Sequence, residues 1–152
     1  MNPNASILKH VFLAEDDEDD RLLFNEALLV VAGSALLTES KNGLELMKNL
    51  HTTSSQFPDI IFLDLNMPLK DGFECLEEIR KERNELANVP VVVFTTSSNK
   101  ANIDVAYKLG ASGYAVKPDN FEKLKNVIIQ ALKKDWQPGK LQPSRQDFVL
   151  TV

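Results

Sequence analysis

Short, mostly apolar runs alternate with longer amphipathic stretches along this chain, and this alternation limits the fold more than any other feature. The runs, which favour strands, are residues 11–14, 35–39, 60–63, 91–94 and 112–116. Each is followed by a stretch whose apolar residues recur at helical spacing. Strands that read as continuous aliphatic runs are covered on both faces, and helical crossovers supply that cover. The pattern therefore predicts a doubly wound α/β domain with five parallel strands and helices on both faces.

Three features place the predicted helices. The first helix is expected to bury one apolar face, made of Leu23, Ala27, Val30 and Val31. The second is expected to point Leu44, Met47 and Leu50 inward. The last follows a cap-like start at residues 119–122 and is predicted to run to about Trp136.

Length, charge and cysteine content exclude several classes of protein. The chain has 152 residues, the length of one domain. Its formal net charge of −5 does not supply the basic surface that a non-specific nucleic-acid binder needs, so we expect no nucleic-acid partner. Cys75 is the only cysteine, which excludes a disulfide framework. With no signal-like start and no apolar run near the ~20 residues of a membrane span, we expect a cytoplasmic protein without a membrane partner.

The chain is expected to divide into a domain and a tail. Residues 1–136 make up the domain, and residues 137–152 form a C-terminal tail with no output domain. The tail ends in the apolar segment 148–152. Two interpretations of this segment stay open: it is disordered, or it docks on its own domain or on a second copy, which would give a homodimer.

Polar side chains follow four of the predicted strands. Six consecutive acids, residues 15–20, follow the first strand, and Asp64, Thr95 and Lys117 follow the third, fourth and fifth. In doubly wound sheets ligands bind at the carboxyl ends of the strands, so we expect these groups to meet. Each has a plainer interpretation by itself, since an acidic run also suits a solvated helix start. Their conjunction favours a site, and clustered carboxylates suit Mg²⁺.

Such a set of groups is suited to phosphoryl transfer. A carboxylate can act as a nucleophile that takes up a phosphoryl group, and the reaction asks mainly for positioning and charge neutralisation. Mg²⁺ and a lysine ammonium supply that neutralisation, and a threonine hydroxyl can donate to a phosphoryl oxygen. His10 and His51 are predicted to lie away from this edge of the sheet, which argues against Ser-His-Asp or Cys-His chemistry. Cys75 is expected to be partly buried at the start of the third helix.

A set of short motifs follows the predicted strands: Glu15-Asp16, Asp64 with Asn66-Met67-Pro68, Asp71-Gly72, Thr95, and Tyr114 to Pro118. With these motifs the chain resembles, over roughly residues 7–136, the receiver domain of two-component response regulators. The resemblance implies a flavodoxin-like sheet of strand order 2-1-3-4-5. The chain is also similar to stand-alone, CheY-like regulators that partner phytochrome-type histidine kinases. This similarity lies in residues 64–68, in residues 95–98 and in the ending at Trp136.

The resemblance also implies the acceptor and the metal ligands. Asp64 would accept a phosphoryl group from a phosphohistidine of a sensor histidine kinase. Mg²⁺ would be held by Asp16, by the Asp64 carboxylate and by the backbone carbonyl of Asn66, with Glu15 acting mostly through water.

Other residues receive supporting roles from the same resemblance. Lys117 would pair with Asp64 and then with the phosphoryl group, and Thr95 would hydrogen-bond that group and draw its loop inward. Tyr114 would then rotate inward as the switch residue. Asn66 and Ser97 resemble the positions that set the lifetime of the phosphoryl group.

The function implied is that of a phosphoacceptor signalling protein rather than an enzyme. With no output domain, the signal would leave by phosphorylation-dependent protein contacts or by phosphorelay to a histidine phosphotransfer protein. Three alternatives stay open. A haloacid-dehalogenase-type phosphatase needs an Asp where Asn66 stands, a flavodoxin-like cofactor binder needs a phosphate loop where the acids stand, and a pseudo-receiver would only bind partners.

Overall fold

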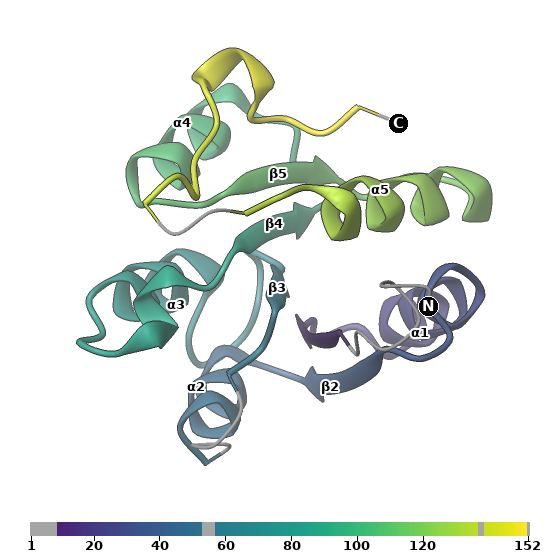
Figure 1. The fold of residues 1–152 in the computed structure, drawn as a ribbon, viewed down its shortest axis with the longest axis horizontal. Helices are drawn as coiled ribbons and strands as arrows, with labels where there is room; N and C mark the ends of the chain where they lie inside the picture. The colour runs from purple at the N-terminus through teal and green to yellow at the C-terminus, as the bar shows by residue number, and fades with distance from the viewer. Residues whose placement is uncertain (1–8, 53–56, 137–138, 152) are drawn as a thin grey trace, which may run out of the picture.

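The computed structural model describes residues 9–52, 57–136 and 139–151, and within them strands and helices alternate (Figure 1). The strands are β1 (His10–Ala14), β2 (Leu36–Ser40), β3 (Ile60–Leu63), β4 (Val91–Thr95) and β5 (Gly113–Val116). The α-helices are α1 (Glu18–Val31), α2 (Gly43–Thr52), α3 (Gly72–Arg80), α4 (Lys100–Lys108) and α5 (Phe121–Lys133). Two short 3-10 helices are η1 (Glu85–Asn88) and η2 (Arg145–Asp147).

The strands form one parallel sheet of order β2-β1-β3-β4-β5, which confirms the predicted fold class and strand order. The pairing aligns the carboxyl ends of the strands. Ala14 lies opposite both Ser40 and Leu63, and Thr95 lies opposite Val116. The loops that follow β1, β3, β4 and β5 therefore leave the sheet at one edge.

Helices cover both faces of the sheet, as the strand pattern predicts. Figure 1 shows α1 and α5 on one face and α2, α3 and α4 on the other. Alternate residues of β1 serve the two faces, because successive side chains of a strand point to opposite sides. Val11 and Leu13 pack with α1 and α5, whereas Phe12 and Ala14 pack with the other helices.

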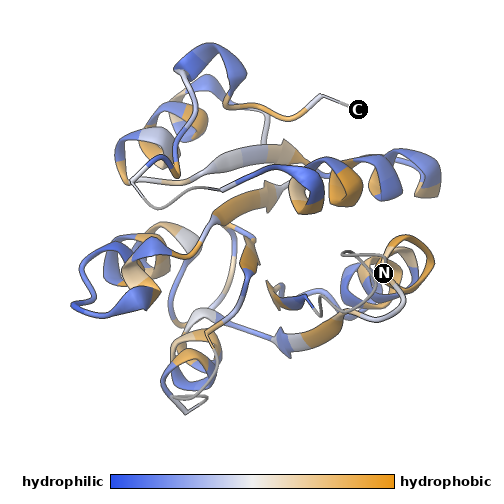
Figure 2. Cartoon of the chain, in the orientation of Figure 1, coloured by the Kyte–Doolittle hydropathy of each residue, from blue (hydrophilic) through white to orange (hydrophobic). Residues whose placement is uncertain are grey.

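The central strands are the most apolar part of the molecule (Figure 2), and every residue of β3 and β4 is buried. An aromatic cluster joins α1 to these strands. The Phe24 ring meets Phe62 and Phe94 edge-on, with centroid separations of 4.9 and 5.8 Å. Aromatic pairs of this kind contribute about 0.5–1.5 kcal/mol beyond the area they bury, so packing of Phe24 favours the rotation of α1 that points this ring at the sheet.

Because of this rotation, the buried face of α1 differs from the predicted one. Its buried residues are Phe24, Ala27 and Leu28, while Leu23 and Val30 are 46% and 63% exposed. Apolar residues occur on more than one side of this helix, and the fit of the Phe24 ring selected one of them. In α2 the predicted inward residues Met47 and Leu50 are buried, which confirms them, but Leu44 is exposed and Leu46 is buried in its place.

The predicted end of α5 is also wrong. The helix stops at Lys133, short of the predicted end at Trp136. The Trp136 indole N–H turns back and donates to the carbonyl of Ala131 at 3.0 Å, which satisfies a carbonyl of the last turn. Among the helices that the structure describes, none combines the length and the apolar character that crossing a bilayer requires.

Residues 139–151 of the tail pack on their own domain, as one of the two open interpretations proposed. Figure 1 shows this segment in yellow, running past α4 and along β5. Phe148 is fully buried, and Val149 forms a parallel bridge with Tyr114 of β5. The tail therefore covers the outer side of the edge strand β5.

Candidate functional site

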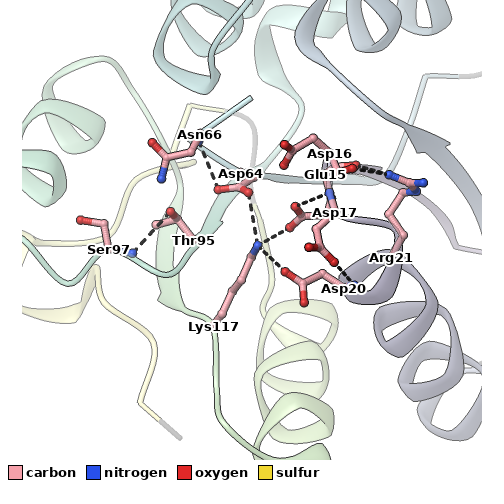
Figure 3. Close-up of polar contacts among 10 residues, drawn as sticks. All are labelled: Glu15, Asp16, Asp17, Asp20, Arg21, Asp64, Asn66, Thr95, Ser97 and Lys117. Atoms are coloured by element: carbon pink, nitrogen blue, oxygen red, sulfur yellow. Dashed lines mark hydrogen bonds and ion pairs between the residues drawn. The ribbon is translucent and has the colours of Figure 1, made fainter. Parts of the chain in front are cut away.

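Asp64 lies at the centre of the polar groups at the carboxyl edge of the sheet (Figure 3). It directly follows β3 and is 4% exposed. Its backbone N–H donates to the carbonyl of Ala14 at 3.0 Å, so the pairing of β3 with β1 continues through it. The backbone N–H of Asn66 lies 3.3 Å from Asp64 Oδ1 and donates to it. The carboxylate is thus held by the strand and by the turn that follows.

Lys117, which follows β5, reaches across to three carboxylates. Its Nζ lies 3.2 Å from Asp64 Oδ2 and 2.9 Å from Asp20 Oδ2, and it also pairs with Glu15. Its backbone N–H donates to the carbonyl of Thr95 at 2.7 Å, which extends the pairing of β5 with β4. Burial acts to lower the pKa of Lys117, but hydrogen bonds to Glu15 and Asp20 raise it above its usual value. The ammonium therefore stays charged.

Three carboxylates, that of Asp64 among them, gather in an arrangement that fits a divalent cation. Glu15, Asp16 and Asp64 each offer one oxygen, and these atoms lie within 4.8 Å of one another. Burial raises the pKa of Glu15 to about 7, the bond from Lys117 opposes this rise, and the charge of Asp64 adds to it. A cation would relieve this crowding of negative charge, and an oxygen-only donor set suits Mg²⁺. Asp16 is exposed, so the cluster opens to solvent.

Asn66, Thr95 and Ser97 lie on the other side of Asp64 from these acids (Figure 3). Thr95 is fully buried, and its Oγ1 accepts a long hydrogen bond of 3.5 Å from the backbone N–H of Ser97. Ser97 is half-buried and the Asn66 side chain is exposed. Tyr114 is fully buried, and its hydroxyl donates to the carbonyl of Ser97 at 2.8 Å. The structure thus brings together all eight residues that the sequence analysis selected.

Two residues of this site were not singled out from the sequence. Asp20 in the first turn of α1 is the third partner of Lys117. Arg21 donates from Nη1 to the backbone carbonyls of Glu15 and Asp16 at 2.9 and 3.0 Å, and so holds the first loop in place. The run of six acids contained the signal for Asp20, but only the rotation of α1 decides which acid faces the lysine.

The histidines lie elsewhere, as predicted, and the cysteine is more deeply buried than expected. His10 begins β1 at the opposite edge of the sheet, and His51 in α2 contacts Glu82. Cys75 is fully buried against the carbonyl of Gly43, and burial raises the pKa of its thiol to about 12. A buried, protonated thiol of this kind is a poor nucleophile.

The comparisons with known proteins agree with this geometry. Residues 11–129 match the response regulator receiver domain family. The response regulator Rcp1 of Synechocystis sp. is 34% identical over 140 residues, which cover 90% of this chain and 94% of Rcp1.

Two solved structures share the fold. The phosphorylated cyanobacterial phytochrome response regulator RcpA has a TM-score of 0.75 at 34% identity, covering 86% of this chain and 94% of RcpA. The Mn²⁺-bound form of the response regulator Rcp1 has a TM-score of 0.72 at 33% identity, covering 90% of this chain and 99% of that one.

Proposed function

The chain belongs to the response regulator receiver domain family, and from this premise we propose that it is a single-domain response regulator that accepts a phosphoryl group on Asp64. Proteins of this family are signalling proteins of two-component systems. The observation that carries the proposal is the contact of the Asp64 carboxylate with Lys117 inside a cluster of acids. A nucleophile, a fixed positive charge and a metal-binding donor set are the groups that phosphoryl transfer needs.

In the proposed reaction an oxygen of Asp64 attacks the phosphorus of a phosphohistidine. The new O–P bond makes an acyl phosphate, the N–P bond breaks, and the imidazole leaves with the bonding electron pair. Mg²⁺ held by Glu15, Asp16, Asp64 and the Asn66 carbonyl would neutralise charge on the phosphoryl oxygens. The chain itself contributes a carboxylate whose position the sheet fixes and whose burial limits access of water.

Lys117 and Thr95 are proposed to hold the product. Once Asp64 carries the phosphoryl group, the Lys117 ammonium pairs with a phosphoryl oxygen instead of the carboxylate, and the Thr95 hydroxyl donates to another. Thr95 draws its loop inward and Tyr114 responds, since its hydroxyl is bonded to the Ser97 carbonyl in that loop. Asn66 and Ser97 lie on the same side of Asp64 as Thr95 (Figure 3), where they would tune the lifetime of the phosphoryl group.

The proposed partners are a sensor histidine kinase, of phytochrome type as the RcpA structure suggests, and a histidine phosphotransfer protein. We propose that residues 1–136 form the receiver domain and residues 137–152 a tail. Activity is limited to the protein's own phosphorylation and dephosphorylation. A cytoplasmic location, the absence of a nucleic-acid partner, and a homodimer stay predictions.

Incubation with acetyl phosphate and Mg²⁺, followed by intact mass measurement, tests the acceptor. We expect one phosphoryl adduct on the wild-type protein, none on Asp64→Asn, and none on the wild type in the presence of a chelator. Asp119→Asn is the matched control, because Asp119 is exposed and outside the site, and it should carry the adduct.

Two outcomes would contradict the proposal. An adduct on Asp64→Asn would assign the acceptor elsewhere, and a wild-type protein without any adduct would be a pseudo-receiver. Steady turnover of a phosphomonoester by the purified protein would favour the phosphatase alternative instead.

A further inference from the structure

Arg21 places a positive charge near the start of α1, where the helix itself does not favour one. The unsatisfied N–H groups and the dipole at a helix start favour acids, and the residues just before Arg21 are acids. Its side chain is nevertheless only 12% exposed. Within the residues that the structure describes, its one ion pair is with Glu39 of β2, at 4.0 Å, and the Glu39 side chain is 44% exposed. Such a pair stabilises little, so the position of this guanidinium needs another explanation.

The guanidinium binds the backbone of the loop that carries the site's first acids. Its Nη1 donates to the carbonyls of Glu15 and Asp16 at 2.9 and 3.0 Å, and Figure 3 shows it beside this stretch of backbone. The Glu15 N–H donates to the Ser40 carbonyl at 2.9 Å, and Asp17 is the N-cap of α1. The sheet therefore holds the loop on one side, the helix cap holds it on the other, and Arg21 holds the two carbonyls between them.

These two carbonyls belong to residues that supply two of the three clustered carboxylates. Glu15 and Asp16 each offer one oxygen, and these oxygens and one of Asp64 lie within 4.8 Å of one another. Rotation of either peptide group would carry the attached side chain away from the cluster. Mg²⁺ demands nearly octahedral geometry, and loss of a group that orients its ligands typically lowers metal affinity about 10–100-fold.

Arg21 has two effects on a cation at this cluster, and they have opposite signs. Its positive charge repels the cation, which weakens binding. Its hydrogen bonds hold the loop in the conformation that gathers the acids, which strengthens binding. The direction in which the affinity changes when Arg21 is replaced therefore separates the two effects.

We propose that Arg21 is the positioning residue of the cation site, and that its hold on the Glu15 and Asp16 carbonyls outweighs the repulsion by its charge. It acts through the loop backbone rather than on the cation directly. The ligand of the site is a divalent cation that prefers oxygen donors, with Mg²⁺ as the probe. The inference rests on the cation site of the proposed function and goes beyond it, because it assigns the geometry of that site to a basic residue of α1.

Isothermal titration calorimetry of Mg²⁺ into the full-length protein, without a phosphodonor, tests the proposal. Arg21→Gln removes the charge and the two hydrogen bonds, and we expect its dissociation constant to be about tenfold or more above that of the wild type. Arg21→Lys keeps the charge but lacks the planar set of donors, and it should also bind more weakly than the wild type. Repulsion by the charge alone predicts tighter binding by Arg21→Gln and no change in Arg21→Lys.

Two control variants change charge without touching the loop. Arg83→Gln is the matched control, because Arg83 is exposed between α3 and β4, at the other edge of the sheet, and the substitution changes the net charge equally. Glu39→Gln removes only the weak ion pair. Both should bind Mg²⁺ as the wild type does. Thermal unfolding without Mg²⁺ shows which variants are folded at the temperature of the titration, and Arg21→Lys decides the question if Arg21→Gln is not folded.

Mg²⁺ binding by a folded Arg21 variant that equals or exceeds that of the wild type overturns the proposal. Equal weakening in Arg83→Gln would mean an effect of net charge and would overturn it as well. If the Arg21 variants bind less Mg²⁺ than the wild type as expected, a wild-type protein without an acetyl phosphate adduct contradicts the proposed function alone. A wild-type protein that binds no Mg²⁺ contradicts the cation site and this inference together.

Discussion

At the scale of single residues, the arrangement around Lys117 distributes one positive charge among several acids. An ammonium has three N–H donors, and Glu15, Asp20 and Asp64 supply three acceptors. Only Asp64 is the proposed acceptor, so the other two carboxylates compete with it for the lysine. Asp20 is the competitor nearest to solvent, since its side chain is 37% exposed.

Asp20→Asn should therefore strengthen the hold of Lys117 on the phosphoryl group. A hydrogen bond between charged groups at such exposure contributes on the order of 1 kcal/mol. We therefore expect the phosphoryl group to be lost roughly twofold to tenfold more slowly. The adduct mass followed with time after removal of acetyl phosphate measures this rate. Asp19→Asn neutralises the neighbouring exposed acid of the same turn, and equal rates for the two variants would refute the role of Asp20.

At the scale of elements, the turn between β3 and α3 places the first residue of α3 against the backbone of Asp64, the proposed phosphoryl acceptor. α3 begins with a capping box, in which the Asp71 side chain accepts from the Glu74 backbone N–H and the Glu74 side chain accepts from the Asp71 backbone N–H. Gly72, the first residue of the helix, lies against Asp64. A Cβ at position 72 would stand 2.3 Å from the Asp64 carbonyl oxygen and 2.8 Å from Leu65 Cα.

Gly72→Ala is expected to move β3 and α3 apart, because both contacts are with backbone that cannot rotate away. We expect a loss of about 1–3 kcal/mol in the free energy of unfolding, together with slower phosphorylation of Asp64. Denaturant unfolding and the acetyl phosphate assay measure the two effects. The control is Gly113→Ala, whose Cβ would meet Val92 Cγ2 at an ordinary 3.6 Å; a comparable loss there would contradict the steric explanation.

At the scale of the whole molecule, loops from both halves of the chain supply the acidic cluster and its lysine. Glu15 and Asp16 follow β1, Asp64 follows β3 and Lys117 follows β5, so these groups are adjacent only when the sheet is formed. A cation that binds this cluster binds the folded state and not the unfolded one. Binding of this kind stabilises the fold by mass action.

Addition of Mg²⁺ should therefore raise the melting temperature. At a concentration one hundred times the dissociation constant the gain is about 2.7 kcal/mol, and scanning calorimetry should detect it as a shift of several degrees. Asp16→Asn should reduce the shift without loss of the fold, because Asp16 is exposed. Sodium chloride at matched ionic strength is the second control, and an equal shift with it would mean general screening rather than a site.

Local pattern was enough to predict the fold class and the positions of Asp64, Thr95 and Lys117, and the resemblance to receiver domains added the strand order. A parallel sheet aligns the carboxyl ends of its strands, so a residue that directly follows a strand has a known place once the strands are known. The same reasoning placed residues inside helices only in part, since Ala27, Met47 and Leu50 are buried as expected but others are not. Leu23 and Val30 were expected in the core and are exposed, whereas Phe24 is buried.

The order of apolar runs and the polar residues that follow them thus determined by themselves that this chain forms a doubly wound sheet with an acidic site at one edge. Tertiary structure alone decided the rotation of α1, and with it the choice of Asp20 as a partner of Lys117. It also decided that the tail docks through Phe148 on the side of β5. Strand ends are ordered by backbone pairing, which local sequence encodes, but helix rotation and tail docking depend on which distant side chains fit together.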